Sequence, residues 1–324
     1  MELQEGELMF AYVLKRILSA CVVILLLLIG IAALVHVLPG DPVQLMVGPN
    51  ASPEMSEQAR QEMDLDSSIP AQVWHFISGI VQGDLGRDFL TREPVISLIG
   101  QALPHTLILA ATALVLAVVA AIVVGTIAAN RPGSWLDRTV GTASVGIISI
   151  PSYVVGLLLL LVFAVWLAWF PAIGTGDLAH PLDYVAHLIL PASSLALIWA
   201  GYLARIVRTS MLEVLSTNYV RAAHAYGIPK RRVLYQLALR NAVVPVVAML
   251  GVALGELMGS AIFIEVIFTR NGLGTLLYNA ISDRNFAVVR GGVVVIAVLF
   301  VVANLLADLA NRAIDPRTKE AVSA

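Results

Sequence analysis

The sequence has little charge and only one cysteine. Charged residues make up 13% of its 324 residues, about half of the roughly 25% that is typical of soluble globular chains. The single cysteine, Cys21, lies in an apolar run, which excludes an internal disulfide bond and argues against cysteine redox chemistry. Hydrophobic residues instead make up 59% of the chain. This composition predicts a membrane protein.

Motifs for nucleotide and metal chemistry are also missing. The chain has no Gly-x4-Gly-Lys-Ser/Thr loop, so we predict that it cannot hydrolyse ATP alone. Its six histidines show no spacing such as His-Glu-x2-His, although His180 and His187 could contact a metal substrate. The stretch 174–177 matches the Gly-x-Gly-Asp pattern of intramembrane aspartyl proteases, but no Tyr-Asp pair supplies a second carboxylate. We therefore predict a non-catalytic protein with no metal site, no cofactor of its own and no nucleic-acid partner.

Long apolar runs indicate how the chain crosses the bilayer. A transmembrane helix needs about 20 mostly apolar residues. The first run is longer than the apolar region of a secretory signal and lacks a small-residue cleavage site, so we expect it to remain as a helix. The sequence thus predicts an all-α membrane protein with six transmembrane helices, over Ile17–Leu38, Leu103–Ala129, Val140–Trp169, Val185–Arg205, Ala242–Phe268 and Val288–Leu309.

Basic residues near the helix ends predict the orientation. With a cytoplasmic N-terminus, 14 of the 20 Lys and Arg residues fall on the cytoplasmic side, in agreement with the positive-inside rule. Both termini are then cytoplasmic. The predicted segments are a cytoplasmic N-terminus (1–16), the first transmembrane helix (17–38), an outer segment (39–102), a five-helix core (103–312) with a cytoplasmic loop (206–241), and a cytoplasmic C-terminal tail (313–324).

The outer segment contains one predicted helix. Residues Ile69–Val81 hold Trp74, Phe76 and Ile77 in a pattern that predicts a short amphipathic helix at the membrane interface. We interpret it as structural cover over the helix bundle. The alternative is a contact surface for an external partner.

A polar island, Asn218–Pro245, interrupts the apolar runs. Helix-forming residues cover Tyr219–Tyr226, Gly227 can adopt the left-handed conformation that ends a helix, and Pro229 suits the start of the next helix. The pattern predicts a short helix, a sharp bend and a second helix, with basic residues Lys230, Arg231 and Arg232 beside the bend. Charge alone would also fit an ordinary cytoplasmic loop.

Spacing within the island favours a more specific interpretation. The residues Ala222-Ala223-x3-Gly227, followed nine residues later by Leu237-x-Leu239, resemble the cytoplasmic loop motif of permease subunits of ABC importers. Arg221 replaces the usual Glu and Arg240 the usual Pro, and both departures resemble the branch that serves peptides and nickel.

The resemblance extends over nearly the whole chain. Asn271 departs from it, because this position before Gly272-Leu273-Gly274 is usually Pro. The matching stretches are Pro39-Gly40-Asp41-Pro42, Gly83-Asp84-Leu85-Gly86-Arg87, Leu103-Pro104-x-Thr106-Leu107, Gly133-Ser134-Trp135-Leu136-Asp137-Arg138, Ile150-Pro151-Ser152 and Asp315-Pro316-Arg317.

The resemblance implies a type I ABC importer permease in the bacterial inner membrane. Its implied partners are a second homologous permease, two cytoplasmic ABC ATPases that bind ATP and Mg, and an extracytoplasmic substrate-binding protein. The Tyr219–Arg232 segment would be the coupling helix, with Ala222 and Ala223 seated in an ATPase cleft and Gly227 at the bend. The implied coupling residues are Tyr219, Arg221, Ala222, Ala223, Gly227, Lys230, Arg231 and Arg232.

Several residues are candidates either for the translocation pathway or for helix packing. Gly251, Gly255 and Gly259 form a small-xxx-small pattern in the fifth predicted span, which favours packing. Glu256 lies near the middle of that span and is interpreted either as pore lining or as a buried structural carboxyl. Pro151 predicts a kink inside the third span, as Pro191 does in the fourth. Glu265 lies at the outer end of the fifth span, a region that resembles part of the family's outer gate.

Two questions on function stay open in the sequence. The resemblance favours di- and oligopeptides as substrates, with nickel, glutathione or another small solute as alternatives. A self-contained secondary transporter or channel is the alternative of a different class. It would be favoured by inverted hydropathy repeats and by charged residues in several spans.

Overall fold

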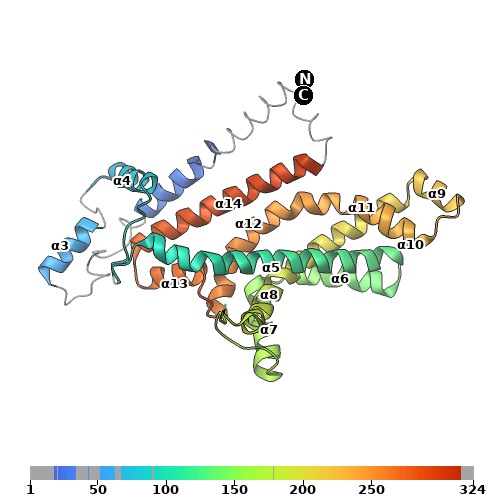
Figure 1. The fold of residues 1–324 in the computed structure, drawn as a ribbon, viewed down its shortest axis with the longest axis horizontal. Coiled ribbons are helices and arrows are strands. Elements are labelled where there is room, and N and C mark those ends of the chain that lie inside the picture. Colours follow the sequence, from blue (N-terminus) through green and yellow to red (C-terminus); the bar gives the residue numbers. More distant parts are fainter. Residues whose placement is uncertain are drawn as a thin grey trace, which may run out of the picture. The chain divides into compact units, whose positions relative to one another are not determined.

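The fold is helical throughout the part of the chain that is described. The computed structural model describes residues 18–19, 21–33, 43, 52–62, 67–89, 91–177 and 179–314. Within these ranges every regular element is a helix, and an isolated bridge joins Arg87 to Pro94 (Figure 1). The chain divides into two compact units, one comprising residues up to His105 with Asn271–Val302, the other Thr106–Arg270 with the chain from Ala303 onward. The prediction of an all-α fold is confirmed.

Most of the predicted spans appear as long apolar helices. Four are long and apolar enough to cross a membrane: α5 (Val95–Asn130), α8 (Pro181–Leu215), α12 (Val244–Ile267) and the stretch Phe286–Leu306 of α14 (Phe286–Ile314). The bent helix pair Asp137–Ile148 and Ser152–Trp166 adds a fifth if its two helices are counted as one span. Of the first predicted span, Cys21–Ala33 forms an apolar helix shorter than a span, and the ends of the prediction lie outside the described residues.

The third predicted span is not the continuous helix that the sequence analysis expected. Helix α6 (Trp135–Ile148) ends before Pro151, and the chain resumes as α7 (Ser152–Leu159) and the π-helix η1 (Leu160–Trp166). The two helices meet at an angle of 106°. Pro151 is the residue that precedes α7, in an extended conformation, rather than a residue inside a kinked helix. Proline has no amide hydrogen and its ring disfavours a helical conformation at the preceding residue, so this position breaks the helix.

Pro191 behaves differently from Pro151. It lies inside α8, which runs without interruption from Pro181 to Leu215, so this proline does not break its helix. Pro104 likewise lies inside α5. The helices also extend beyond the predicted spans. Helix α8, for example, continues after Arg205 to Leu215, through residues too polar for the bilayer core.

A row of small residues lies on the buried side of α5, and at Gly125 the backbone of α5 approaches α8 closely. Ala113, Ala117 and Ala121 recur every four residues and have no exposed surface, and Gly125 continues the row. A Cβ atom added to Gly125 would lie 2.8 Å from the carbonyl oxygen of Ala204. Without a hydrophobic force between helices in lipid, such close backbone contact is a main source of association. The buried side chains of α5, α8 and α12 form the core of the second unit.

In the first unit, two short helices pack against the start of α5. They are α4 (Ile69–Val81) and α13 (Leu273–Ser282). A third short helix, α3 (Pro53–Glu62), precedes them in the chain. The predicted helix over Ile69–Val81 is confirmed with the same bounds. It has a buried and an exposed side, because Val73 is buried while Trp74 is 69% exposed. Leu273 at the start of α13 joins the cluster around Val95. In the same unit the buried Asn285 side chain donates a hydrogen bond to Asp88 Oδ1 at 2.6 Å.

The polar island folds as a helical hairpin that extends the second unit. The elements are α9 (Asn218–Ala225), α10 (Lys230–Arg232), the π-helix η2 (Val233–Ala238) and α11 (Leu239–Ala242). Helix α9 follows α8 after a two-residue connection, and α11 leads into α12. Figure 1 shows α9 and α10 at one end of this unit, away from α7.

Candidate functional site

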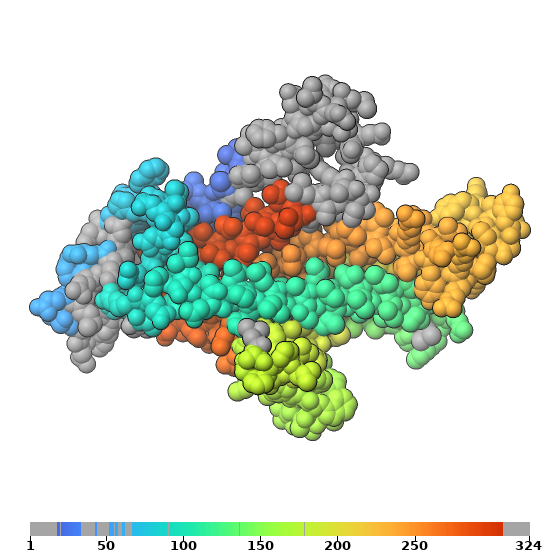
Figure 2. Space-filling model, in the orientation of Figure 1, coloured from blue at the N-terminus to red at the C-terminus, as the bar shows by residue number. Residues whose placement is uncertain are grey.

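Helix α9 is held to its own chain by one face. Val220 and Ala223 are buried there and pack with Val233 of η2 in a small apolar cluster. The Asn241 side chain also donates a hydrogen bond to the Tyr219 hydroxyl at 3.2 Å. The opposite face of α9 remains exposed in the described chain. The hairpin therefore protrudes from its unit while one face of α9 is packed against the rest of the hairpin, and it forms the protruding end in Figure 2.

Gly227 ends α9 in the way that the sequence predicts. Its φ is +72°, in the left-handed region. The Gly227 amide donates to the His224 carbonyl at 3.0 Å, and the Ile228 amide donates to the Ala223 carbonyl at 3.1 Å. This pair of bonds, with the apolar contact between Ile228 and the buried cluster, is a Schellman motif. The expected helix, bend and second helix are confirmed.

Ala222 and Ala223 do not lie on the same surface of the hairpin. Ala222 is exposed, whereas Ala223 is only 8% exposed and packs inside the hairpin. Successive residues on a helix point about 100° apart, so neighbouring side chains cannot face the same surface. Ala222 therefore lies on the free face together with Tyr219, which is 46% exposed, and Tyr226, which is 87% exposed.

Basic residues surround the bend. Lys230, Arg231 and Arg232 are all exposed at the start of α10, directly after Pro229. Arg232 is oriented by a hydrogen bond from its Nε to Gln236 Oε1 at 2.8 Å. On α9, Arg221 donates a hydrogen bond to the Asn218 side chain. The free face of the hairpin thus combines small, aromatic and cationic side chains.

An ion pair that the sequence analysis did not identify lies near the base of the hairpin. The Arg208 guanidinium on α8 contacts both carboxylate oxygens of Asp137, with Nη2 2.8 Å from Oδ2 and Nε bound to Oδ1. Asp137 is 5% exposed. It also accepts a hydrogen bond from the Gly133 amide at 2.9 Å, and its own amide donates to Ser134 Oγ at 3.2 Å. The Ser134-x-x-Asp137 spacing of a helix cap is the signal that could have identified Asp137, although not Arg208.

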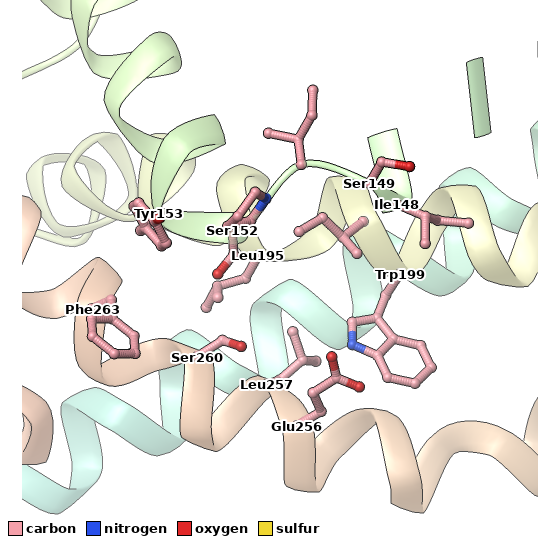
Figure 3. Close-up of a pocket in the computed structure, with 13 residues that line it drawn as sticks. Ile148, Ser149, Ser152, Tyr153, Leu195, Trp199, Glu256, Leu257, Ser260 and Phe263 are labelled. Atoms are coloured by element: carbon pink, nitrogen blue, oxygen red, sulfur yellow. The ribbon is translucent and has the colours of Figure 1, made fainter. Parts of the chain in front are cut away.

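A pocket with a mostly apolar lining and a few polar side chains lies in the second unit where α6 breaks from α7. It has a volume of about 340 Å³ and is lined by α8 and α12 as well as by the break (Figure 3). Glu256 and Trp199 both line it, and Figure 3 shows their polar atoms directed into it. Pro151 belongs to the same lining, so the structure brings together two residues that the sequence analysis named separately.

The three glycines of α12 do not share one environment. Gly251 and Gly255 are buried, but Gly259 is exposed, and a Cβ atom added there would meet no atom within 4 Å. Steps of four residues turn a helix by about 40°, so a row of three spreads over two faces. Within the described chain, packing therefore accounts for Gly251 and Gly255 but not for Gly259.

Glu265 lies in a buried polar cluster at the end of α12. It has no exposed surface and accepts a hydrogen bond from Thr106 Oγ1 at 2.7 Å. Arg270, also without exposed surface, donates from Nη1 to the His187 carbonyl at 2.9 Å and lies 5.6 Å from the Tyr184 ring centre. Burial lowers the pKa of the Arg270 guanidinium from its ordinary value, and the charge of Glu265 opposes that shift. Glu265 is thus enclosed by its own chain and bonded to α5 through Thr106.

No metal centre emerges from the described residues. They contain no group of three or more His, Cys, Asp or Glu side chains arranged to hold an ion. Instead, His180 Nδ1 lies 2.8 Å from Asp177 Oδ2, and His187 Nδ1 lies 3.3 Å from Asp183 Oδ1. The Ala179 amide and then the His180 ring lower the pKa of Asp177.

These features define a helical chain with spans suited to a membrane, an exposed hairpin and an open pocket beside its packed core. Residues 121–320 match the family described as binding-protein-dependent transport system inner membrane component, and residues 9–110 match the family described as its N-terminal part. The chain belongs to this family. It is therefore an inner-membrane permease of a binding-protein-dependent ABC importer, a transport subunit rather than an enzyme, as predicted.

Individual relatives agree with this assignment. The glutathione transport system permease protein GsiC of Escherichia coli K12 is 37% identical over 308 residues, which cover 95% of this chain and 98% of the relative. A peptide transport system permease protein of Brucella melitensis biotype 1 is 39% identical over 313 residues, covering 96% and 99%. A chain of the MetNI methionine ABC transporter, solved in an inward-facing conformation, has a TM-score of 0.57 at 22% identity and covers 69% of this chain and 99% of its own. This last likeness confirms the type I permease fold.

Proposed function

We propose that this chain forms half of the translocation pathway of an ATP-driven importer of di- and oligopeptides. A second homologous permease forms the other half, and an extracytoplasmic binding protein delivers the substrate. Two cytoplasmic ABC ATPases bind ATP and Mg and supply the energy. Membership of the binding-protein-dependent family supports this assembly, and relatives named for glutathione and peptide transport support a peptide-like substrate.

The α9 hairpin is the proposed docking site for one ATPase. The observation that carries this proposal is that α9 is fixed on one face by Val220 and Ala223 while its other face is free. A force applied to the free face is then transferred to η2 and α11 rather than absorbed by a loose loop. Ala222 would make the close contact, because a methyl side chain lets another backbone approach. Ala223 would act through packing inside the hairpin.

The Asp137–Arg208 pair supports the transfer of this force. It joins α6 to α8 ten residues before α9 begins. Motion of the hairpin would therefore reach both α8 and α6, and α6 leads to the break that lines the pocket. Pro151, Glu256 and Gly259 are the pathway residues that we propose on this basis.

Glutathione is the second candidate substrate, because the relative GsiC is named for it. Glutathione and short peptides share a free amino group and at least one carboxylate, so one pathway could accept both. Nickel receives no support from the described side chains, which contain no group suited to hold a metal ion.

The proposed assembly is tested by purifying the tagged full-length chain with its complex from the native membrane. We expect a second permease and ABC ATPase subunits to co-purify, and we expect proteoliposomes containing this complex to accumulate labelled tripeptide only with ATP and the loaded binding protein. A matched preparation with Ala222→Glu should contain the second permease but little ATPase. Peptide uptake by the isolated chain without ATP would contradict the proposal and favour a secondary transporter.

A further inference from the structure

The pocket beside the α6–α7 break has one charged side chain in an otherwise neutral lining. Glu256 is the only one of the 13 lining residues whose side chain is normally charged at neutral pH. The others are apolar, aromatic or hydroxyl-bearing, among them Ser152, Ser260 and Trp199. A cavity of about 340 Å³ is in the range of small-ligand pockets. Its chemistry is thus that of a site for one cationic group.

Glu256 lies where a carboxylate is hardest to accommodate. It is near the centre of α12, with about 18 Å of helix on either side. Ionisable residues at such depth almost always face a bundle interior or a water-filled cavity and serve a function. A purely structural carboxylate would be expected to have a partner in its own chain, as Glu265 has in Thr106. Within the described residues Glu256 makes no hydrogen bond or ion pair, and it is exposed.

The exposure of Glu256 follows from the face of α12 on which it lies. Val252, Gly259 and Phe263 are exposed on the same face, whereas Leu257 and Ala253 are buried against the core. The carboxylate therefore points out of the packed core of this unit, and Figure 3 shows it beside the Trp199 indole at the pocket wall. The alternative of a buried structural carboxyl does not fit this position.

Aromatic rings add a second attraction for a cation. Trp199 is 7% exposed and fixed in the α8 packing, with its ring 5.5 Å from that of Tyr202 in an edge-to-face arrangement. Tyr153 and Phe263 also line the pocket, with ring centres 6.2 Å apart. Indole and phenyl faces attract ammonium groups, most strongly where water is excluded. Hydroxyl oxygens of Ser152 and Ser260 can accept the remaining N–H donors.

We propose that this pocket binds the ammonium group of the substrate during its passage, with Glu256 as the counter-charge and Trp199 as the aromatic wall. This inference rests on the proposed peptide transport. The α-amino group of a peptide has a pKa of about 7.7 to 8.0, so it is mostly protonated at neutral pH. No lining residue carries a positive charge, so the pocket would receive the amino end of the peptide and not its carboxylate.

The test compares two peptides in the reconstituted complex. A labelled tripeptide and its N-acetylated form are selected as a pair that the binding protein binds with equal affinity, and uptake is measured at saturating loaded binding protein. The variants are Glu256→Gln, which keeps the shape and removes the charge, and Glu256→Asp, which keeps the charge. Glu57→Gln on α3 is the control for loss of an exposed carboxylate elsewhere. Each variant is first checked for assembly with the ATPases and for basal ATP hydrolysis.

We expect Glu256→Gln to lower uptake of the free-amino peptide about tenfold and to leave uptake of the acetylated peptide within twofold of the unmodified protein. Glu256→Asp should recover part of the loss, and Glu57→Gln should change neither rate. Equal loss for both peptides would overturn the inference and assign Glu256 a structural role. Unchanged uptake of both peptides would also overturn it. Failure of the unmodified complex to import either peptide would instead count against the proposed function.

Discussion

The guanidinium of Arg208 binds both carboxylate oxygens of Asp137, across 71 residues of sequence. The carboxylate lies in the first turn of α6 and the guanidinium in the last third of α8. Because Asp137 also accepts the Gly133 amide, a single side chain fixes the turn before α6, the start of α6 and the position of α8. Such two-pronged pairs combine energy with geometric specificity.

Asp137→Asn should destabilise the chain by about 2 kcal/mol, because it removes the charge that the partly exposed Arg208 guanidinium binds through two hydrogen bonds. Thermal unfolding of the purified protein in detergent measures the loss. The double variant Asp137→Arg with Arg208→Asp should recover only part of it. The exchange restores opposite charges, but it places a cation at the N-terminus of α6, where the helix dipole favours an anion. Full recovery would show that capping of α6 contributes little.

Gly227→Val should weaken coupling through the backbone alone. A side chain at this position would meet no atom within 4 Å, so its cost arises from the left-handed conformation, about 1 to 2 kcal/mol for a residue other than glycine. Gly227→Asn is the matched control, because asparagine tolerates this conformation. We expect low ATP-driven uptake for Val and near-normal uptake for Asn at equal expression. Equal uptake by the two variants would argue that the bend is not required.

Ala222→Glu and Ala223→Glu should fail for different reasons. The exposed Ala222 can carry a carboxylate without strain in the free chain, so this variant should keep its thermal stability and lose the bound ATPase. Ala223 is buried against Val220 and Val233, so the same carboxylate there should lower the thermal stability as well. Pull-down of the ATPase together with an unfolding curve separates the two effects. Normal ATPase binding by Ala222→Glu would remove the free face of α9 from the interface.

Gly125→Ala should destabilise the packing of α5 on α8 by about 1 to 3 kcal/mol, the usual cost of overpacking a core. The added Cβ would lie 2.8 Å from the Ala204 carbonyl oxygen, and a backbone atom cannot move aside by changing rotamer. Gly259→Ala serves as the control, because its added Cβ meets open space. Unfolding midpoints in the same detergent should fall for the first variant and stay level or rise for the second. Equal midpoints would contradict the proposed close approach.

Local patterns in the sequence predicted the helices and the bend well. The apolar runs identify α5, α8, α12 and α14 because burial in lipid requires apolar residues along the whole span. Gly227 was identified because the left-handed conformation depends on the residue itself. At Pro151 the sequence predicts a kink where the structure has a break, since proline permits either outcome and the surrounding packing decides between them.

Relationships between distant residues were not predictable from one sequence. Nothing near Arg208 indicates Asp137 as its partner, and the close contact of Gly125 appears only when α8 is placed beside it. Helical periodicity alone predicts that Ala222 and Ala223 lie on different faces, whereas the family motif treats the two alanines as one unit. Glu265 and Glu256 look alike in sequence. Packing buries Glu265 and leaves Glu256 open.

Helix α8 has contacts near both of its ends. Tyr184 lies against Arg270 near the first end and Arg208 binds Asp137 near the other. Tyr184 and Arg208 are 24 positions apart in the sequence, which corresponds to about 36 Å of helix. A lever of that length turns a tilt of about 5° into a displacement of about 3 Å at its far end, roughly the diameter of a water molecule. If α6 follows α8 through the Arg208–Asp137 pair, such a tilt would keep both contacts and would be large enough to wet or dry a passage beside the helix.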